Sequence, residues 1–219
     1  SKRIKHFNQK RKDVPIMCIA MNSPKGTTPT KEALKTSFEN NPHGAGFAFA
    51  KDGKIIIEKG FMTFDSFYSA YQKANIQGLN KLIHFRIKTS GQINYDNCHP
   101  FKVTENLALI HNGVIPHFGG SEVSDTREFI EMVLRPIIIK NGLDILTNKT
   151  FIDAMSDMIG GSKLAFLDSS GKSYFINESL GHTNCDIWYS NNSYTSYDKY
   201  VIKGGWSSDY CNEDRKSVV

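Results

Sequence analysis

The chain has 219 residues, of which 39% are hydrophobic and 11% aromatic, and its formal net charge is +5. This size suffices for one domain with a substantial core, and the aromatic content excludes wholesale disorder. No apolar run is long enough to span a membrane, and the basic start lacks the apolar segment of a secretory signal, so we expect a cytoplasmic protein without membrane contact.

The positive charge is concentrated at the start of the chain. Residues 1–17 contain six basic residues and one acidic residue, and the remaining residues balance 21 basic against 21 acidic side chains. We expect this arm to be a solvated tail. A second interpretation is that it contacts nucleic acid or another acidic surface. The expected organisation is a basic arm over 1–17 and a folded domain over 18–219.

The first half of the folded part alternates short apolar runs with turn residues. Strands are expected over 16–21, 43–50 and 55–60. Asp52-Gly53 is the expected hairpin turn between the last two strands. Thr30 is a candidate cap of a helix over 31–40, and an aromatic stripe at helical spacing predicts a core-facing helix over 63–75.

The second half contains the longer helices. Further strands are expected over 81–87, 107–115, 163–168, 173–177 and 187–191. Ser124 is a candidate cap of a helix over 124–140 that Pro136 interrupts, and another helix is expected over 150–159. The order of strands, helices and strands, with few parallel βαβ units, favours an α+β fold with largely antiparallel sheets.

The cysteines show no paired spacing and are expected to be reduced thiols. They are Cys18, Cys98, Cys185 and Cys211. Cysteine and histidine do not cluster at metal-ligand spacing, and no nucleotide-binding fingerprint occurs in the sequence. We therefore expect no metal and no cofactor.

Polar side chains interrupt three otherwise apolar stretches. They are His84, Arg86 and Thr89 in HFRIKTSG, Asn97 and His99 in NCHPF, and His111, Asn112 and Gly113 in LALIHNGVI. A buried arginine in a strand needs a carboxylate partner. A strand that ends in Asn-Gly offers an amide and backbone N–H groups that can hold a carbonyl oxygen. Each stretch alone also fits a structural explanation, either a core ion pair or a simple turn.

Taken together and in order, these stretches resemble the class II glutamine amidotransferase domain, an N-terminal-nucleophile hydrolase. The resemblance rests on Met17-Cys18-Ile19, NPHGAGFAFA, HFRIKTSG, NCHPF, HNG, the SDT at 124–126 and DIWYSNNSY. It covers roughly residues 17 to 195, and the order of the motifs makes it more specific than any single motif. It implies a four-layer α/β/β/α sandwich of N-terminal-nucleophile hydrolase type.

The resemblance also implies the chemistry. Cys18 would attack the side-chain amide of glutamine, form a γ-glutamyl thioester and release ammonia. Asn112 and the backbone N–H of Gly113 would hold the oxyanion.

Four further residues would bind the substrate. The planar guanidinium of Arg86 would bind the α-carboxylate of glutamine, and Asp125 would bind its α-ammonium group. Thr89 and His99 would shape the pocket. Lys88 departs from the family, which often has a small residue before this threonine.

A catalytic cysteine needs a base. In the family that this sequence resembles, the base is the α-amine of the catalytic cysteine itself. The ordinary pKa of an α-amine is near 7.7–8.0, which suits catalysis at neutral pH. The bond Met17–Cys18 would then have to be cut, and residues 1–17 would be a propeptide. With the arm retained, the alternative is a catalytically silent binding or structural protein on the same fold. A third interpretation makes a histidine the base, and its candidates are His84, His99 and His111.

The leading hypothesis is a glutaminase that feeds ammonia to a separate acceptor enzyme or simply hydrolyses glutamine. Only about twenty-four residues follow the glutaminase-like region, which leaves no room for the usual synthase domain. Another amide, such as a γ-glutamyl peptide, is a further candidate substrate.

Overall fold

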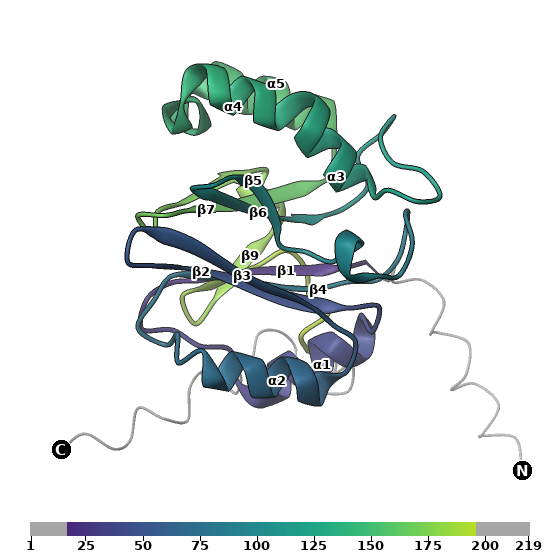
Figure 1. The fold of residues 1–219 in the computed structure, drawn as a ribbon, viewed down its shortest axis with the longest axis vertical. Coiled ribbons are helices and arrows are strands. Elements are labelled where there is room, and N and C mark those ends of the chain that lie inside the picture. Colours follow the sequence, from purple (N-terminus) through teal and green to yellow (C-terminus); the bar gives the residue numbers. More distant parts are fainter. Residues whose placement is uncertain (1–16, 196–219) are drawn as a thin grey trace, which may run out of the picture.

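Two β-sheets lie face to face, with helices on their outer sides (Figure 1). The structure is a computed structural model that describes residues 17–195, so the predictions on the basic arm and on Cys211 lie outside the described residues. Within this range, no helix is long and apolar enough to cross a bilayer.

All strand pairs in both sheets are antiparallel, which confirms the prediction from the sequence. The first sheet has the order β3 (Lys54–Phe61), β2 (Ala45–Lys51), β4 (Lys81–Phe85), β1 (Ile19–Ser23), β10 (Ile187–Tyr189) and β9 (His182–Asn184). The second sheet has the order β5 (Phe101–Thr104), β6 (Leu107–Asn112), β7 (Lys163–Asp168) and β8 (Ser173–Ile176). Strands β5 and β9 are missing from the predicted elements because both are short, and β5 is half polar whereas β9 is entirely polar.

The core consists of three apolar layers, and β1 contributes to two of them. Ile19 and Met21 point toward the helices α1 (Lys31–Asn40) and α2 (Phe64–Lys73), whereas Ala20 points toward the second sheet. Both faces of the strand are therefore buried, which explains why its first three residues are all apolar. The layer between the sheets is rich in alanine, whose small side chain lets two sheets approach closely.

The predicted turns and caps are confirmed where the sequence chemistry was specific. Lys51 pairs with Lys54, and the two residues between them, Asp52 and Gly53, have φ values of 51° and 72°. Such positive values are what a two-residue hairpin turn requires. The Thr30 hydroxyl accepts a hydrogen bond from the Ala33 N–H at 3.1 Å and so caps α1.

The aromatic stripe of α2 packs into the core, as predicted. Phe67 is fully buried, and its ring lies 4.8 Å from that of Phe85 and 6.0 Å from that of Phe47. Aromatic rings at these separations and tilts add to the stability that burial provides.

The regular α-helix that begins after Ser124 is interrupted just before Pro136, as predicted, although the chain does not leave the helical conformation there. The chain stays helical through α3 (Asp125–Phe129), the π-helical segment η2 (Ile130–Leu134) and α4 (Arg135–Asn141). Proline lacks an N–H and clashes with the preceding turn, and the wider π turn just before it accommodates both effects. Helix α5 (Lys149–Ile159) follows the short 3₁₀ segment η3 (Leu143–Thr147).

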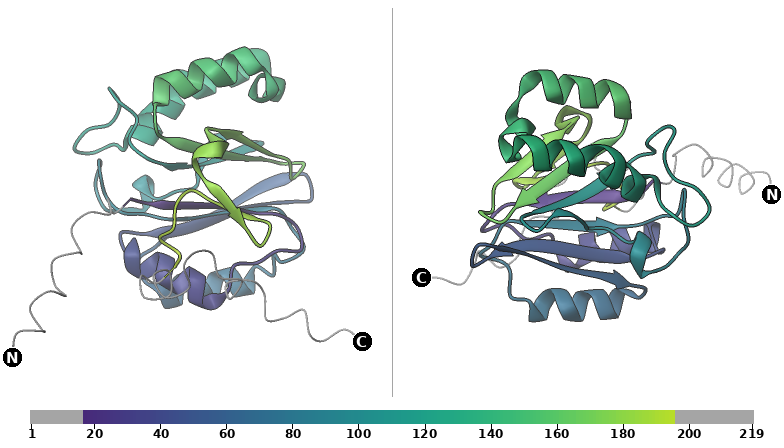
Figure 2. Two further views of the ribbon diagram at one scale, coloured as in Figure 1. Left: turned by 180° about the vertical axis from the view of Figure 1, so that it is seen from behind. Right: turned by 45° about the horizontal axis from the view of Figure 1, so that its top comes forward.

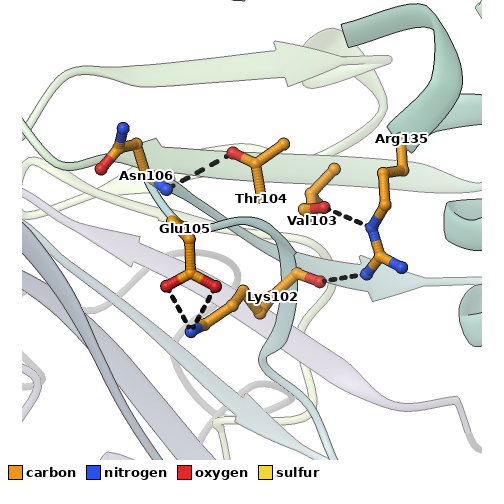
Figure 3. A network of polar contacts seen from close by, with 6 residues as sticks. All are labelled: Lys102, Val103, Thr104, Glu105, Asn106 and Arg135. Carbon is orange, nitrogen blue, oxygen red and sulfur yellow. Dashed lines mark hydrogen bonds and ion pairs between the residues drawn. The ribbon is translucent and has the colours of Figure 1, made fainter. Parts of the chain in front are cut away.

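Arg135 ties α4 to the edge of the second sheet (Figure 3). Its Nε donates to the Val103 carbonyl oxygen at 2.7 Å, and its Nη2 donates to that of Lys102 at 3.0 Å. Both carbonyls belong to β5, an edge strand, and covering such groups protects an edge from pairing with other chains. Both views of Figure 2 show α4 and α5 outside this sheet.

Two further 3₁₀ segments complete the fold, η1 (Tyr95–Asn97) and η4 (Glu178–Leu180). Cys18 and Cys98 are free thiols. Cys185 is disulfide-bonded, so the expectation of four reduced thiols is wrong at that position.

Candidate functional site

Cys18 lies directly before β1, at the end of the first sheet where β4 also ends. The antiparallel register pairs Ile19 with Phe85, so the residues that follow β4 lie beside Cys18. The Cys18 Sγ donates to the Ile87 carbonyl oxygen and accepts from the Ile87 N–H, each at 3.2 Å. Strand pairing thus brings the predicted nucleophile next to the HFRIKTSG stretch.

Asn112 ends β6 and reaches Cys18 from the second sheet. Its side-chain N–H donates to the Cys18 carbonyl oxygen, and Asn191, just beyond β10, donates to the same oxygen at 2.7 Å. The Nζ of Lys163 lies 3.4 Å from the amide oxygen of Asn112. The amide predicted to hold the oxyanion therefore lies at Cys18, where it binds the backbone carbonyl of that residue. Asn191 lies in the DIWYSNNSY stretch, but the sequence analysis gives no role to it or to Lys163.

Gly113 continues from Asn112 into a turn that no larger residue fits. Its φ is 141°, and an added Cβ would lie 2.2 Å from the Ser162 Oγ and 2.7 Å from the Ser162 Cα. The Ser162 hydroxyl donates to the Val114 carbonyl oxygen at 2.9 Å, which fixes this contact. The backbone after β6 is therefore pressed against the residue that precedes β7.

Arg86 is buried, and its guanidinium binds the loop that follows β4. It donates to the Ser90 carbonyl oxygen at 2.7 Å and to that of Gln92 at 2.9 Å. The expected carboxylate partner is wrong, because carbonyl oxygens take that place. The arginine backbone is held by His43 and Gly44 of the NPHGAGFAFA stretch, at 2.9 and 2.8 Å.

Asp125 is also buried, and the chain surrounds its carboxylate with donors. The Ile115 N–H and the Thr126 N–H each donate to it at 2.8 Å. Ser90 connects it to the arginine, since the Ser90 hydroxyl lies 3.4 Å from Asp125 and the Ser90 carbonyl accepts from Arg86. The two predicted anchors of the substrate thus share one loop beside the thiol.

The two residues predicted to shape the pocket lie in different surroundings. Thr89 is exposed on the loop after β4. His99 is buried, with its ring 4.1 Å from that of His84 and its Nε2 3.2 Å from the Thr126 Oγ1. His99 thus contacts Thr126, the residue whose N–H donates to Asp125. The pocket-shaping role of both residues stays a prediction.

The Cys18 thiol is a weak acid in the uncut chain. Burial raises its pKa to about 11, although the hydrogen bond from Ile87 and the charge of Arg86 act in the opposite direction. At pH 7 only about one thiol in 10⁴ is then ionised. An adjacent base is therefore needed before this sulfur can act as a nucleophile.

Three buried histidines lie close together, and two of them, His99 and His111, contact Thr126. His84 Nε2 lies 2.9 Å from the His111 carbonyl oxygen, which can only accept, so this nitrogen carries a proton. The Thr126 Oγ1 lies 2.8 Å from His111 Nδ1, 3.2 Å from His99 Nε2 and 3.4 Å from an oxygen of Asp125. The other three ring nitrogens have no hydrogen-bond partner in the structure.

Burial also keeps these rings neutral. It lowers the pKa of His84 to about 3 and that of His111 to about 4, and it lowers the pKa of His99 well below its ordinary value. His84 binds the His111 carbonyl oxygen, and His99 and His111 bind Thr126. The Cys18 thiol instead binds the backbone of Ile87. The geometry gives no support to a histidine base. Among residues 17–195, no group of His, Cys, Asp and Glu could hold a metal ion.

Comparison with known proteins gives likenesses to solved structures. No protein-family model matches the sequence, and no curated protein matches it. The fold is similar to that of glutamine phosphoribosylpyrophosphate amidotransferase from B. subtilis, with a TM-score of 0.50 and 18% identity. The matched region covers 78% of this chain and 41% of the length of that enzyme, and at this identity the likeness concerns the fold.

Proposed function

We propose that this chain is a glutamine amidohydrolase that becomes active once the bond before Cys18 is cut. The observation that carries the proposal is the meeting of Cys18, Arg86, Asn112 and Asp125 at one end of the two sheets. The fold likeness to a glutamine amidotransferase supports the same kind of chemistry. The proposed fold type is the four-layer α/β/β/α sandwich of N-terminal-nucleophile hydrolases, with 1–17 as propeptide and 18–219 as the domain.

The substrate is proposed to bind as a zwitterion. Arg86 has five N–H donors, of which two bind the Ser90 and Gln92 carbonyl oxygens, so three remain for the α-carboxylate. Asp125 carries the opposite charge beside the same loop and suits the α-ammonium group. Together they set the side-chain amide of glutamine at the thiol.

The reaction begins with a proton transfer from the Cys18 thiol to its own freed α-amine. The thiolate attacks the amide carbon, a C–S bond forms, and the carbonyl electron pair moves to oxygen, where Asn112 and the Gly113 N–H hold it. The α-ammonium returns the proton to the leaving nitrogen, the C–N bond breaks, and ammonia departs. Water then attacks the thioester, the C–S bond breaks, and glutamate leaves as the thiol regains its proton.

The direct test compares the full-length chain with a chain that begins at Cys18. Because burial raises the pKa of the Cys18 thiol and the α-amine is tied up in a peptide bond before cleavage, we expect the cut chain to release ammonia and glutamate at least ~100-fold faster. Ammonia and glutamate should form in equal amounts. A folded Cys18-terminal chain with no turnover would contradict the proposal. Parallel assays with γ-glutamyl peptides would identify a different amide substrate.

Arg86→Lys tests the substrate anchor in the cut chain. Lysine cannot reproduce a planar fork that binds two carbonyl oxygens and a carboxylate, so we expect kcat/KM for glutamine to fall by about 10- to 100-fold, mainly through KM. Arg127→Lys, at a partly exposed arginine of α3, is the matched control and should leave KM within twofold. Equal KM values for the two variants would contradict a role of Arg86 in binding the substrate.

A catalytically silent binding or structural protein is the second candidate function. The observation that favours it is that both anchors already have partners within the chain, since Arg86 binds two carbonyl oxygens and Asp125 binds the Ile115 and Thr126 N–H groups. A retained basic arm would then contact nucleic acid or an acidic partner. Intact mass of the purified protein separates the two candidates, because only the enzyme is expected to begin at Cys18. A separate ammonia-acceptor enzyme belongs to the first candidate.

A further inference from the structure

Asn191 contacts the nucleophile from a part of the chain 173 residues away. Its side-chain N–H donates to the Cys18 carbonyl oxygen at 2.7 Å, and the Asn112 amide donates to the same oxygen. A carbonyl oxygen has two lone pairs, so both amides bind it at once. One side chain from the second sheet and one from the segment after β10 therefore fix one backbone oxygen of Cys18.

The orientation of both amides follows from what binds their oxygen ends. The Asn191 Oδ1 accepts from the Ser193 N–H at 2.9 Å and from the Ser193 hydroxyl, and the Asn112 Oδ1 faces the Lys163 ammonium at 3.4 Å. Since these partners only donate here, the oxygen ends are fixed toward them and the NH₂ ends toward Cys18.

The residues next to Cys18 and Asn191 also bind each other, so the contact of Asn191 extends a pairing that Ala20 and Ser190 begin. The Ala20 N–H donates to the Ser190 Oγ and the Ser190 N–H donates to the Ala20 carbonyl, each at 2.9 Å. The segment after β10 thus runs alongside residues 18–20, with Ser190 at Ala20 and Asn191 at Cys18. Asn191 makes the last of these contacts, at the nucleophile.

We propose that Asn191 is a positioning residue that, with Asn112, clamps the Cys18 carbonyl and holds the thiol against Ile87. Its catalytic consequence rests on the proposed glutaminase function, and the clamp itself can be measured without turnover. In the reaction Asn112 turns an N–H toward the oxyanion. Asn191 then keeps the Cys18 carbonyl fixed, so the sulfur does not move as Asn112 changes partner.

Thiol alkylation of the full-length chain tests the clamp. Iodoacetamide at pH 8, followed by peptide mass spectrometry, gives separate rates for Cys18 and for Cys98, the buried free thiol. Releasing Cys18 exposes its sulfur and raises its ionised fraction, so Asn191→Ala is expected to speed alkylation of Cys18 about tenfold and leave Cys98 unchanged. Asn192→Ala, at the exposed neighbouring asparagine, should change neither rate.

Two results would overturn the clamp. One is a Cys18 rate within twofold of the unchanged protein, and the other is an equal rise at Cys18 and Cys98, which indicates general loosening of the fold. If Asn191→Ala does not fold, Asn191→Asp keeps the oxygen that binds Ser193 and removes the donor, and the same outcomes apply.

Kinetics of the Cys18-terminal chain then test the catalytic consequence. Asn191→Ala should lower kcat about tenfold with KM within twofold, because the substrate anchors are untouched while the nucleophile is less well placed. An unchanged kcat would overturn the positioning role. Absence of turnover in the unsubstituted cut chain, with selective release of Cys18 by Asn191→Ala, would reject the proposed function and retain the clamp.

Discussion

Cys18→Ala in a chain that begins at residue 18 is expected to lower kcat for glutamine hydrolysis by on the order of 10⁴-fold or more. The thiol is the only group in the proposed reaction that forms a bond to the substrate, and Asn112, Arg86 and Asp125 hold the substrate without replacing it. Glutamine binding should persist in this variant, because both charged anchors remain. Ammonia release and isothermal titration with glutamine measure the two quantities separately.

Cys98→Ala is the matched control for that variant. Cys98 is also a free thiol, but it is fully buried and its Sγ donates to the Asn94 carbonyl oxygen at 3.2 Å. Its replacement should leave kcat within about threefold, at a modest loss of stability typical of a small core change. Comparable loss of activity in both variants would contradict a nucleophile at Cys18.

Gly113→Ala is expected to damage both stability and activity. The new Cβ would meet the Ser162 Cα at 2.7 Å, and φ of 141° disfavours any L side chain. Backbone must shift, so the free energy of unfolding should fall by about 2–4 kcal/mol. The same shift moves the N–H proposed to bind the oxyanion, so kcat should fall about 10²- to 10³-fold in the cut chain.

Gly161→Ala separates the local clash from a general effect of removing a glycine. A Cβ at Gly161 would meet nothing within 4 Å, although this residue lies next to Ser162. Chemical denaturation and glutamine kinetics of both variants give the comparison. Equal stability of Gly113→Ala and Gly161→Ala would show that the contact with Ser162 is not tight.

Local chemistry made several elements predictable. Asp52-Gly53 specified its hairpin because a two-residue turn needs two positive φ values, and Thr30 specified the start of α1 because its hydroxyl replaces a missing backbone acceptor. Pro136 marks an interruption of the α-helix because its local preference is to end one. The wider π turn before it lets the chain stay helical.

The sequence by itself determined which residue types stand in which order: a thiol before an apolar strand, an arginine after a histidine in another strand, and an Asn-Gly after a third. It could not show that Ser90 and Gln92 bind Arg86, or that Asn191 shares the Cys18 carbonyl with Asn112. Those contacts join residues from separate strands and loops. They depend on strand register and on the distance between the sheets, which are set when the whole core packs and not by any local stretch of chain.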